Sequence, residues 1–73
     1  MTLLELLKRT NRNQKIDLFN CNCTVIALDL TNKEIINTLL TEFEKNFLKI
    51  INCDIEQICV ADKNLEVTLK ESF

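Results

Sequence analysis

The chain of 73 residues contains no histidine, no glycine and no proline, and its only aromatic residues are four phenylalanines. Without histidine, it lacks the usual general base near neutral pH and the commonest metal ligand. Without glycine, it cannot form the phosphate-binding loops of the Walker or Rossmann type. We therefore expect a binding or assembly protein rather than an enzyme, with no catalytic residue and no cofactor.

Hydrophobic runs long enough to cross a bilayer are also lacking. The leucine-rich start is not an export signal, because its cations follow the apolar run instead of preceding it. We therefore expect a cytoplasmic protein, or one of an equivalent reducing compartment such as a plastid stroma. The hydrophobic content of 47% nevertheless predicts a folded domain. A core of this size is marginal, and such chains often gain stability from a metal, disulfides or a second copy.

Residues 1–15 hold the most distinctive pattern of the sequence. Thr2 and Glu5 have the spacing of a capping box, which predicts a short helix. Its apolar face is followed by cations, as in segments that lie in the surface of an anionic membrane. The predicted membrane-binding residues, at the inner face of a membrane, are Leu3, Leu4, Leu6, Leu7, Lys8, Arg9 and Arg12. The alternative is that the leucines fold back on the protein's own core.

Charge divides the chain at the same point. Residues 1–15 carry a net charge of +3, and residues 16–73 carry one of −5. A basic end on an acidic body indicates an anionic partner for the N-terminal segment alone. We expect no nucleic-acid binding, because the body would repel phosphate and no aromatic residue lies among the cations. We therefore divide the chain into an N-terminal segment, 1–15, and a single αβ dimerisation domain, 16–73.

The segment 16–30 is predicted to be extended. Its residues 23–28 have the apolar, β-rich character of a central strand. A helical spacing is present as well, at Leu18, Cys21, Val25 and Leu28. Strand and helix therefore both remain open for this segment.

A second helix is predicted to begin at Thr31, because Thr31 and Glu34 repeat the capping-box spacing. The apolar residues that follow, as far as Ile51, cover an arc of roughly 160° at about 100° per residue. One face of a sheet needs less than this, so the stripe suggests that the helix also packs on its copy in a homodimer. The predicted dimer-interface residues are Ile36, Leu40, Phe43 and Phe47.

Two further strands are predicted at 55–61 and 65–70, the second with clean alternation of apolar and polar residues. In the turn between them, Asn64 is the best candidate for a positive φ. The predicted fold is α+β: a short helix, then β-α-β-β with a three-stranded antiparallel sheet under one helix. Such a sheet leaves an open edge, which dimerisation would complete into a larger sheet.

Four cysteines occur in the sequence, at positions 21, 23, 53 and 59. Cys21 and Cys23 would share one face of a strand, but Cys53 and Cys59 are too widely spaced for a zinc knuckle. Disulfides are not expected in a chain without an export signal. We therefore expect four small core residues and no metal site, with a zinc site of four thiolates as the alternative.

Four stretches carry a resemblance to a known family: residues 1–7, 24–27, 47–60 and 65–69. In order, they resemble the N-terminal membrane-targeting helix, the first strand, the helix end with the second strand, and the last strand of MinE. This family comprises the topological specificity factors of division-site selection. The region 16–30 departs from the family pattern, in which arginines and lysines flank the first strand, because it carries Asp17 and Asp29 and no cation.

The resemblance implies a membrane-associated dimer that regulates a MinD-type ATPase in division-site placement. In such a protein the first strand leaves the sheet on meeting its partner and becomes helical, and the N-terminal helix is freed to bind lipid. The partner-binding residues that the resemblance implies are Leu18, Phe19, Val25 and Ile26.

A second hypothesis needs no membrane. The chain would be a small dimeric adaptor or inhibitor protein that covers a basic surface of a protein partner with its acidic body. The acidic residues available for this are Glu34, Glu42, Glu44, Asp54, Glu56 and Glu66. For any single one of them, a solvated surface position is the simpler reading.

Overall fold

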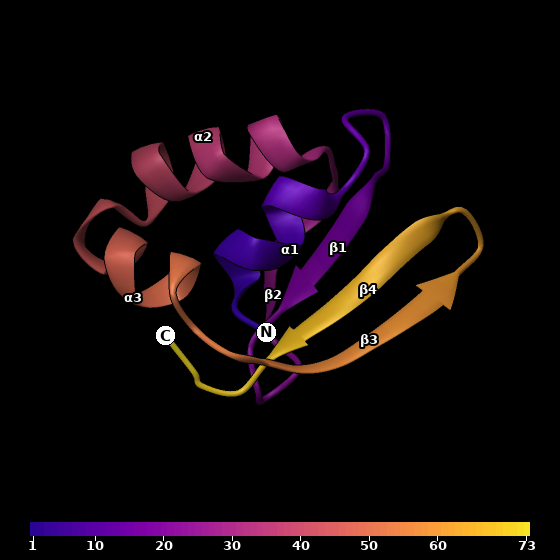
Figure 1. Cartoon of the computed structure of the whole chain (residues 1–73). Helices are drawn as coiled ribbons and strands as arrows, with labels where there is room; N and C mark the ends of the chain where they lie inside the picture. Colours follow the sequence, from indigo (N-terminus) through magenta and orange to yellow (C-terminus); the bar gives the residue numbers. More distant parts are fainter.

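The computed structural model of the chain describes all 73 residues and has an α+β fold. Its helices lie on one side of a four-stranded mixed sheet with the strand order β2-β1-β4-β3 (Figure 1). The helices are α1 (Leu3–Arg9), α2 (Asn32–Glu42) and α3 (Phe47–Ile51), with a short 3-10 turn, η1 (Glu44–Asn46), between the last two. The strands are β1 (Ile16–Phe19), β2 (Val25–Leu30), β3 (Ile55–Ala61) and β4 (Asn64–Leu69).

Both predicted capping boxes are present and fix where α1 and α2 begin. At α2, the Thr31 N–H donates to Glu34 Oε1 at 2.9 Å, and the Glu34 N–H donates to Thr31 Oγ1 at 3.4 Å. Thr2 and Glu5 form the same reciprocal pair at α1. Each box satisfies N–H groups that the first turn of a helix leaves without a partner.

The predicted second helix is interrupted, which is a correction. The backbone of Phe43 leaves the helical region (φ −125°, ψ 33°), so α2 ends there, and α3 begins after η1. The break divides the apolar stripe between two helices. Ile35 and Leu39 are buried in the core from α2, and Ile50 and Ile51 are buried in the same core from α3. Most of the stripe is therefore buried or half-buried within one chain, and Leu40 is the exception.

The segment 16–30 forms two strands joined by a turn, where the sequence predicted one extended run. Its apolar second half, β2, lies at the edge of the sheet and not at its centre as predicted. The reason is a reversal at residues 20–24, where Asn20 is buried and Cys23 has a positive φ of 62°. The turn lets β1 enter the sheet between β2 and β4.

The sheet is mixed, and this corrects the predicted three-stranded antiparallel sheet. β1 pairs antiparallel with β2 but parallel with β4, in the register Ile16↔Leu65 to Phe19↔Thr68. The parallel pairing joins residues that are far apart in the sequence. It requires the long crossover through α2 and α3, which covers one face of the sheet.

The β3–β4 hairpin agrees with the prediction except at its turn. Ala61 and Asn64 pair, so the loop consists of Asp62 and Lys63 alone. The positive φ, 56°, is at Asp62 and not at Asn64 as predicted. A two-residue hairpin loop places a positive φ at its first residue, and Asn64 is already the first residue of β4.

The core lies between the helices and the sheet, and α1 contributes to it. Leu3 and Leu7 are buried in the same cluster as Ile16, Leu18 and Leu69. Leu4 and Leu6 are half-buried and pack against that cluster. The boundary predicted after residue 15 falls in the loop between α1 and β1. In this state α1 is part of the core.

Candidate functional site

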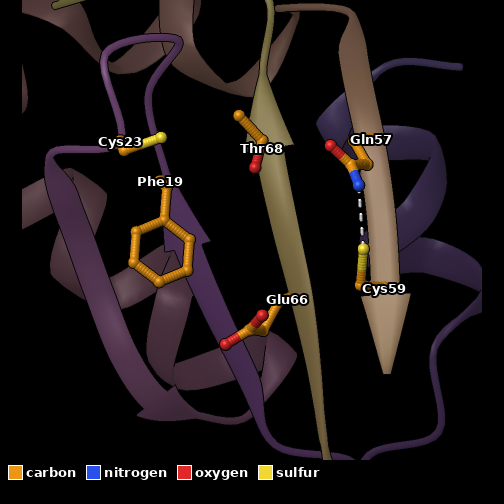
Figure 2. A pocket seen from close by; sticks show the side chains of 6 residues that line it. All are labelled: Phe19, Cys23, Gln57, Cys59, Glu66 and Thr68. Atoms are coloured by element: carbon orange, nitrogen blue, oxygen red, sulfur yellow. Dashed lines mark hydrogen bonds between the residues drawn. The ribbon is translucent and has the colours of Figure 1, made fainter. Parts of the chain in front are cut away.

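The opposite face of the sheet carries no helix, and we call it the open face. Phe19 of β1 and Val25 of β2 are cross-strand partners on it. Beside Phe19 is a shallow hollow of about 230 Å³, shown in Figure 2. The hollow is lined by Phe19, Cys23, Gln57, Cys59, Glu66 and Thr68. These side chains come from three strands and the β1–β2 turn, so the tertiary fold assembles the hollow.

The sheet is strongly acidic for its size. None of its four strands contains a lysine or an arginine, and their charged residues are Asp17, Asp29, Glu56 and Glu66. Asp17 and Glu66 are in register on the neighbouring parallel strands β1 and β4. Like charges that lie opposite each other across strands are destabilising. The open face therefore carries an uncompensated negative charge next to the hollow.

The Asp17 carboxylate is held in place by its neighbours. Its Oδ1 accepts the Asp29 N–H at 2.8 Å and the Asn64 Nδ2 at 3.2 Å. The same Asn64 amide also donates to Asp29 Oδ1 at 3.1 Å. These bonds explain the positive φ of Asp29, 56°, because the distorted backbone aims its N–H at Asp17. Glu66 has no such partner and is free to contact a ligand.

The predicted partner-binding residues are divided between the two faces. Phe19 and Val25 lie on the open face, with Val25 47% exposed. Leu18 and Ile26 are buried in the core on the helical side. A partner could therefore contact only two of the four without unfolding the hairpin.

The predicted membrane-binding residues are similarly divided. The leucines of α1 face the core, whereas Lys8, Arg9 and Arg12 are exposed. These cations have no carboxylate partner, because the only ion pair in the chain joins Lys15 and Glu34 at 3.6 Å. The cations of the predicted site can therefore contact a membrane, whereas its leucines already pack in the protein's own core.

Backbone bonds also fasten α1 at both ends. The Leu3 N–H donates to the Cys53 carbonyl at 2.9 Å, and the Ile55 N–H donates to the Met1 carbonyl at 2.8 Å. At the other end, Asn32 Nδ2 donates to the Leu7 carbonyl at 3.1 Å. Release of α1 would break these bonds and expose buried leucines.

Of the predicted dimer-interface residues, three pack against the core of their own chain: Ile36, Phe43 and Phe47. Leu40 is 49% exposed on α2. Of the four predicted interface residues, Leu40 therefore offers the most apolar surface to a second copy.

The cysteines do not form the predicted set of core residues. Only Cys53 is buried, whereas Cys21, Cys23 and Cys59 are exposed. Burial raises the pKa of the Cys53 thiol. The structure brings no three Cys, Asp or Glu side chains into an arrangement that could hold a metal ion. Three of the four thiols therefore lie outside the core in which they were predicted, because the β1–β2 turn and the edge strand β3 expose them to solvent.

Gln57 and Thr68 of the hollow were not singled out from the sequence, and Glu66 was named only among the acidic residues of the adaptor hypothesis. The signal for two of them was present. The alternation of 65–70 places Glu66 and Thr68 on the polar face of their strand. The polar face of β4 lies beside Phe19 because β1 and β4 pair in parallel. No local pattern in the sequence predicts this pairing.

Comparison with known proteins gives no relative. No family model matches the sequence, and no match is found among curated proteins or solved structures. None of the helices combines the length and the apolar character that are needed to span a lipid bilayer.

Proposed function

We propose that this chain is a small protein-binding adaptor whose open face binds a basic, partly apolar surface of another protein. The observation that carries the proposal is the side-by-side placement of Asp17 and Glu66 next to Phe19, on strands without a single cation. Such a cluster lowers the stability of the free protein. A partner with lysines or arginines would remove the repulsion, so binding would relieve a cost of folding.

The chemistry of the partner follows from the face. Phe19 and Val25 offer an apolar contact at one side, and Glu66 offers a carboxylate at the edge of the hollow. Arginine suits this combination best, because its guanidinium binds a carboxylate through two bonds and stacks on an aromatic ring. We therefore expect an Arg-containing segment with neighbouring apolar residues.

Titration of the labelled protein with a synthetic peptide of alternating Arg and Leu, followed by NMR, tests the proposal. Amide shifts should be confined to the open face, around Phe19, Gln57 and Thr68. Glu66→Lys should weaken binding about tenfold or more, the loss of one charge-assisted contact. Glu42→Lys makes the same charge change on the exposed side of α2 and should change affinity little. Equal weakening by the two variants would refute the open face as the site.

A membrane-associated regulator of the MinE type is a second candidate. The observation that favours it is the exposed, unpaired group Lys8, Arg9 and Arg12 at one end of α1. In this proposal, α1 leaves the core on reaching an anionic membrane, and the chain stimulates a MinD-type ATPase there. The cost is the exposure of Leu3 and Leu7, which the lipid would have to cover again.

Flotation with anionic and with neutral vesicles tests this candidate. The double variant Lys8→Glu/Arg9→Glu should abolish binding to anionic vesicles, because it inverts an exposed charge without touching the core. Lys45→Glu/Lys49→Glu makes the same change near α3 and serves as the control. On vesicles, the Ile55 amide, which donates to the Met1 carbonyl while α1 is docked, should lose its protection from hydrogen exchange. Failure to float, or protection that persists on the vesicle, would rule out a released helix.

A further inference from the structure

We infer that two copies of the chain pair through β3, antiparallel and about a two-fold axis at Cys59, so that two four-stranded sheets become one. This surface differs from the helical face predicted above, and it does not depend on the proposed adaptor function. β3 lies at one edge of the sheet, and no strand of the same chain pairs with its outer side (Figure 1).

The edge is unusually unprotected. Edge strands are normally shielded by lysine, proline or bulges. β2, the other edge, has this protection, because its register is shifted and Asp29 has a positive φ. From Gln57 to Ala61, β3 has no charged residue, no proline and a regular register with β4. A strand of this kind is a template for another strand.

The side chains of β3 on the helical side are exposed and apolar. Ile58 pairs with the buried Val67, and Val60 pairs with Leu65, so both point to the side on which the helices lie. The helices do not extend over them, and Ile58 is 43% and Val60 73% exposed. A second copy placed against the edge would cover both.

The hairpin determines which backbone groups are free. Ala61 and Asn64 close a two-residue loop and therefore form a hydrogen-bonded pair. Such pairs alternate along an antiparallel ladder, so Cys59 and Gln57 also bond to β4. The N–H and C=O groups of Ile58 and Val60 then point outward. These are the groups that a second strand would use.

The register follows from the N-terminal segment. Thr2 bridges Asp54 and Met1 bonds to Ile55, so the start of the β3 edge is already occupied. Pairing Ile58 with Ile58 of a second copy would drive the partner's turn into Thr2. Pairing Ile58 with the second copy's Val60 avoids this collision. It also makes about four interchain backbone hydrogen bonds between the outward-facing groups.

A second copy of the chain fits the β3 edge because this register is self-complementary. Each strand supplies one isoleucine and one valine to two equivalent apolar pairs. Glu56 then meets the partner's turn, where Asp62 is followed directly by Lys63, so the local charge is balanced in part. The two open faces become continuous across the axis, with a hollow on each side of it.

This register predicts how far Cys59 lies from its equivalent in the second copy. Cys59 would face Cys59 of the second copy as a pair without hydrogen bonds, with Cα atoms about 4.5 Å apart. A disulfide requires Cα atoms about 4.4–6.8 Å apart. Cys59 is exposed on the open face, so an added oxidant can reach it.

Cross-linking tests the register. Cys21→Ser/Cys23→Ser leaves Cys59 as the only exposed thiol, while the buried Cys53 is retained. Diamide, which accepts the two electrons and two protons of two thiols, should convert this variant to a covalent dimer. The further change Cys59→Ser should abolish the product. A dimer in solution that fails to cross-link would overturn the register.

Sedimentation in reducing buffer tests the surface. The wild type should sediment with twice the mass of one chain, and Val60→Lys should return it to one chain. Leu48→Lys, at a site that is 71% exposed on α3, is the matched control and should leave the dimer intact. A wild type that is monomeric at every concentration would overturn the inference. So would a dimer that withstands Val60→Lys but is lost in Leu40→Lys, because the helical face would then be the interface.

Discussion

Asn20 and Thr24 are joined twice, once through the backbone and once through a side chain. The Asn20 N–H donates to the Thr24 carbonyl at 3.0 Å, and the Thr24 N–H donates to Asn20 Oδ1 at 3.0 Å. The same Oδ1 accepts the Asn22 N–H at 3.0 Å. This buried amide therefore reverses the chain between β1 and β2, and the sheet depends on it.

Replacement of Asn20 by alanine should lower the free energy of unfolding by about 1–3 kcal/mol, because it removes two hydrogen bonds worth about 0.5–1.5 kcal/mol each. Asn20→Asp keeps the acceptor oxygen and should cost less. Asn22→Ala, in the exposed part of the same turn, should change stability by less than about 0.5 kcal/mol. Urea denaturation of the three variants provides the measurement. Equal effects of Asn20→Ala and Asn22→Ala would contradict the role of the side chain.

Leu3 should be essential to the fold although it stands near the N-terminus. It is fully buried, so Leu3→Ala should lower the free energy of unfolding by about 2–5 kcal/mol. Leu48→Ala removes the same atoms from an exposed site and should cost less than about 0.5 kcal/mol. Denaturation midpoints of the two variants give the comparison, provided that the dependence of the unfolding free energy on denaturant concentration is the same in both. A neutral Leu3→Ala would mean that α1 is detached in solution.

The stability of the protein should fall in acid through the capping boxes. Hydrogen bonds from the Thr31 backbone, and then from its hydroxyl, hold the pKa of Glu34 below the ordinary value of 4.5. The pKa of Glu5 is lowered in the same way by Thr2. Near pH 4.5 the unfolded chain thus binds more protons than the folded one. The stabilisation is present above pH 4.5 and is lost as the pH falls through the lowered folded value.

Glu34→Gln should flatten this dependence, because glutamine keeps an acceptor for the Thr31 N–H but does not titrate. Glu42→Gln, on an exposed position of the same helix, is the control and should leave the slope unchanged. Unfolding free energies measured from neutral pH down to acid would show the difference. Parallel curves for Glu34→Gln and the wild type would argue against the assignment.

The four thiols should react in two classes with a disulfide reagent such as Ellman's. Cys21, Cys23 and Cys59 are exposed and should react rapidly in the folded protein. Cys53 should react only as the protein unfolds, because it is buried and its raised pKa keeps it protonated. Stopped-flow absorbance with and without denaturant counts the thiols in each class. Four rapid thiols in the folded protein would be inconsistent with the packing of Cys53.

Much of the fold was predictable wherever the information is local. The starts of α1 and α2 follow from Thr-x-x-Glu, since the bonds of a capping box lie within one turn. The strands of the β3–β4 hairpin follow from alternation and a short polar turn. The break at Phe43 was missed because a phenylalanine in an apolar periodic pattern fits a continuous helix locally. The turn at Asn20 was missed although Asn20 and Asn22 are turn-forming residues, because the apolar residues on both sides indicated one extended segment.

The candidate site was predictable in part. Phe19 and Val25 were among the partner-binding residues that the resemblance implied, and they are cross-strand partners on the open face. Leu18 and Ile26 were selected with them but face the core. The difference is the face of the strand on which each residue lies, and the irregular register of β1 with β2 made simple alternation a poor guide.

By itself, the amino-acid sequence determined the α+β class, the two capped helix starts and a final hairpin, because these depend on neighbours a few residues apart. Only the tertiary structure decided three other matters: the parallel pairing of β1 with β4, the edge position of β2 and the burial of the α1 leucines. Each of these joins segments that are distant in the chain. Their free energy depends on which apolar faces meet, and a pattern of residues along one segment does not contain that information.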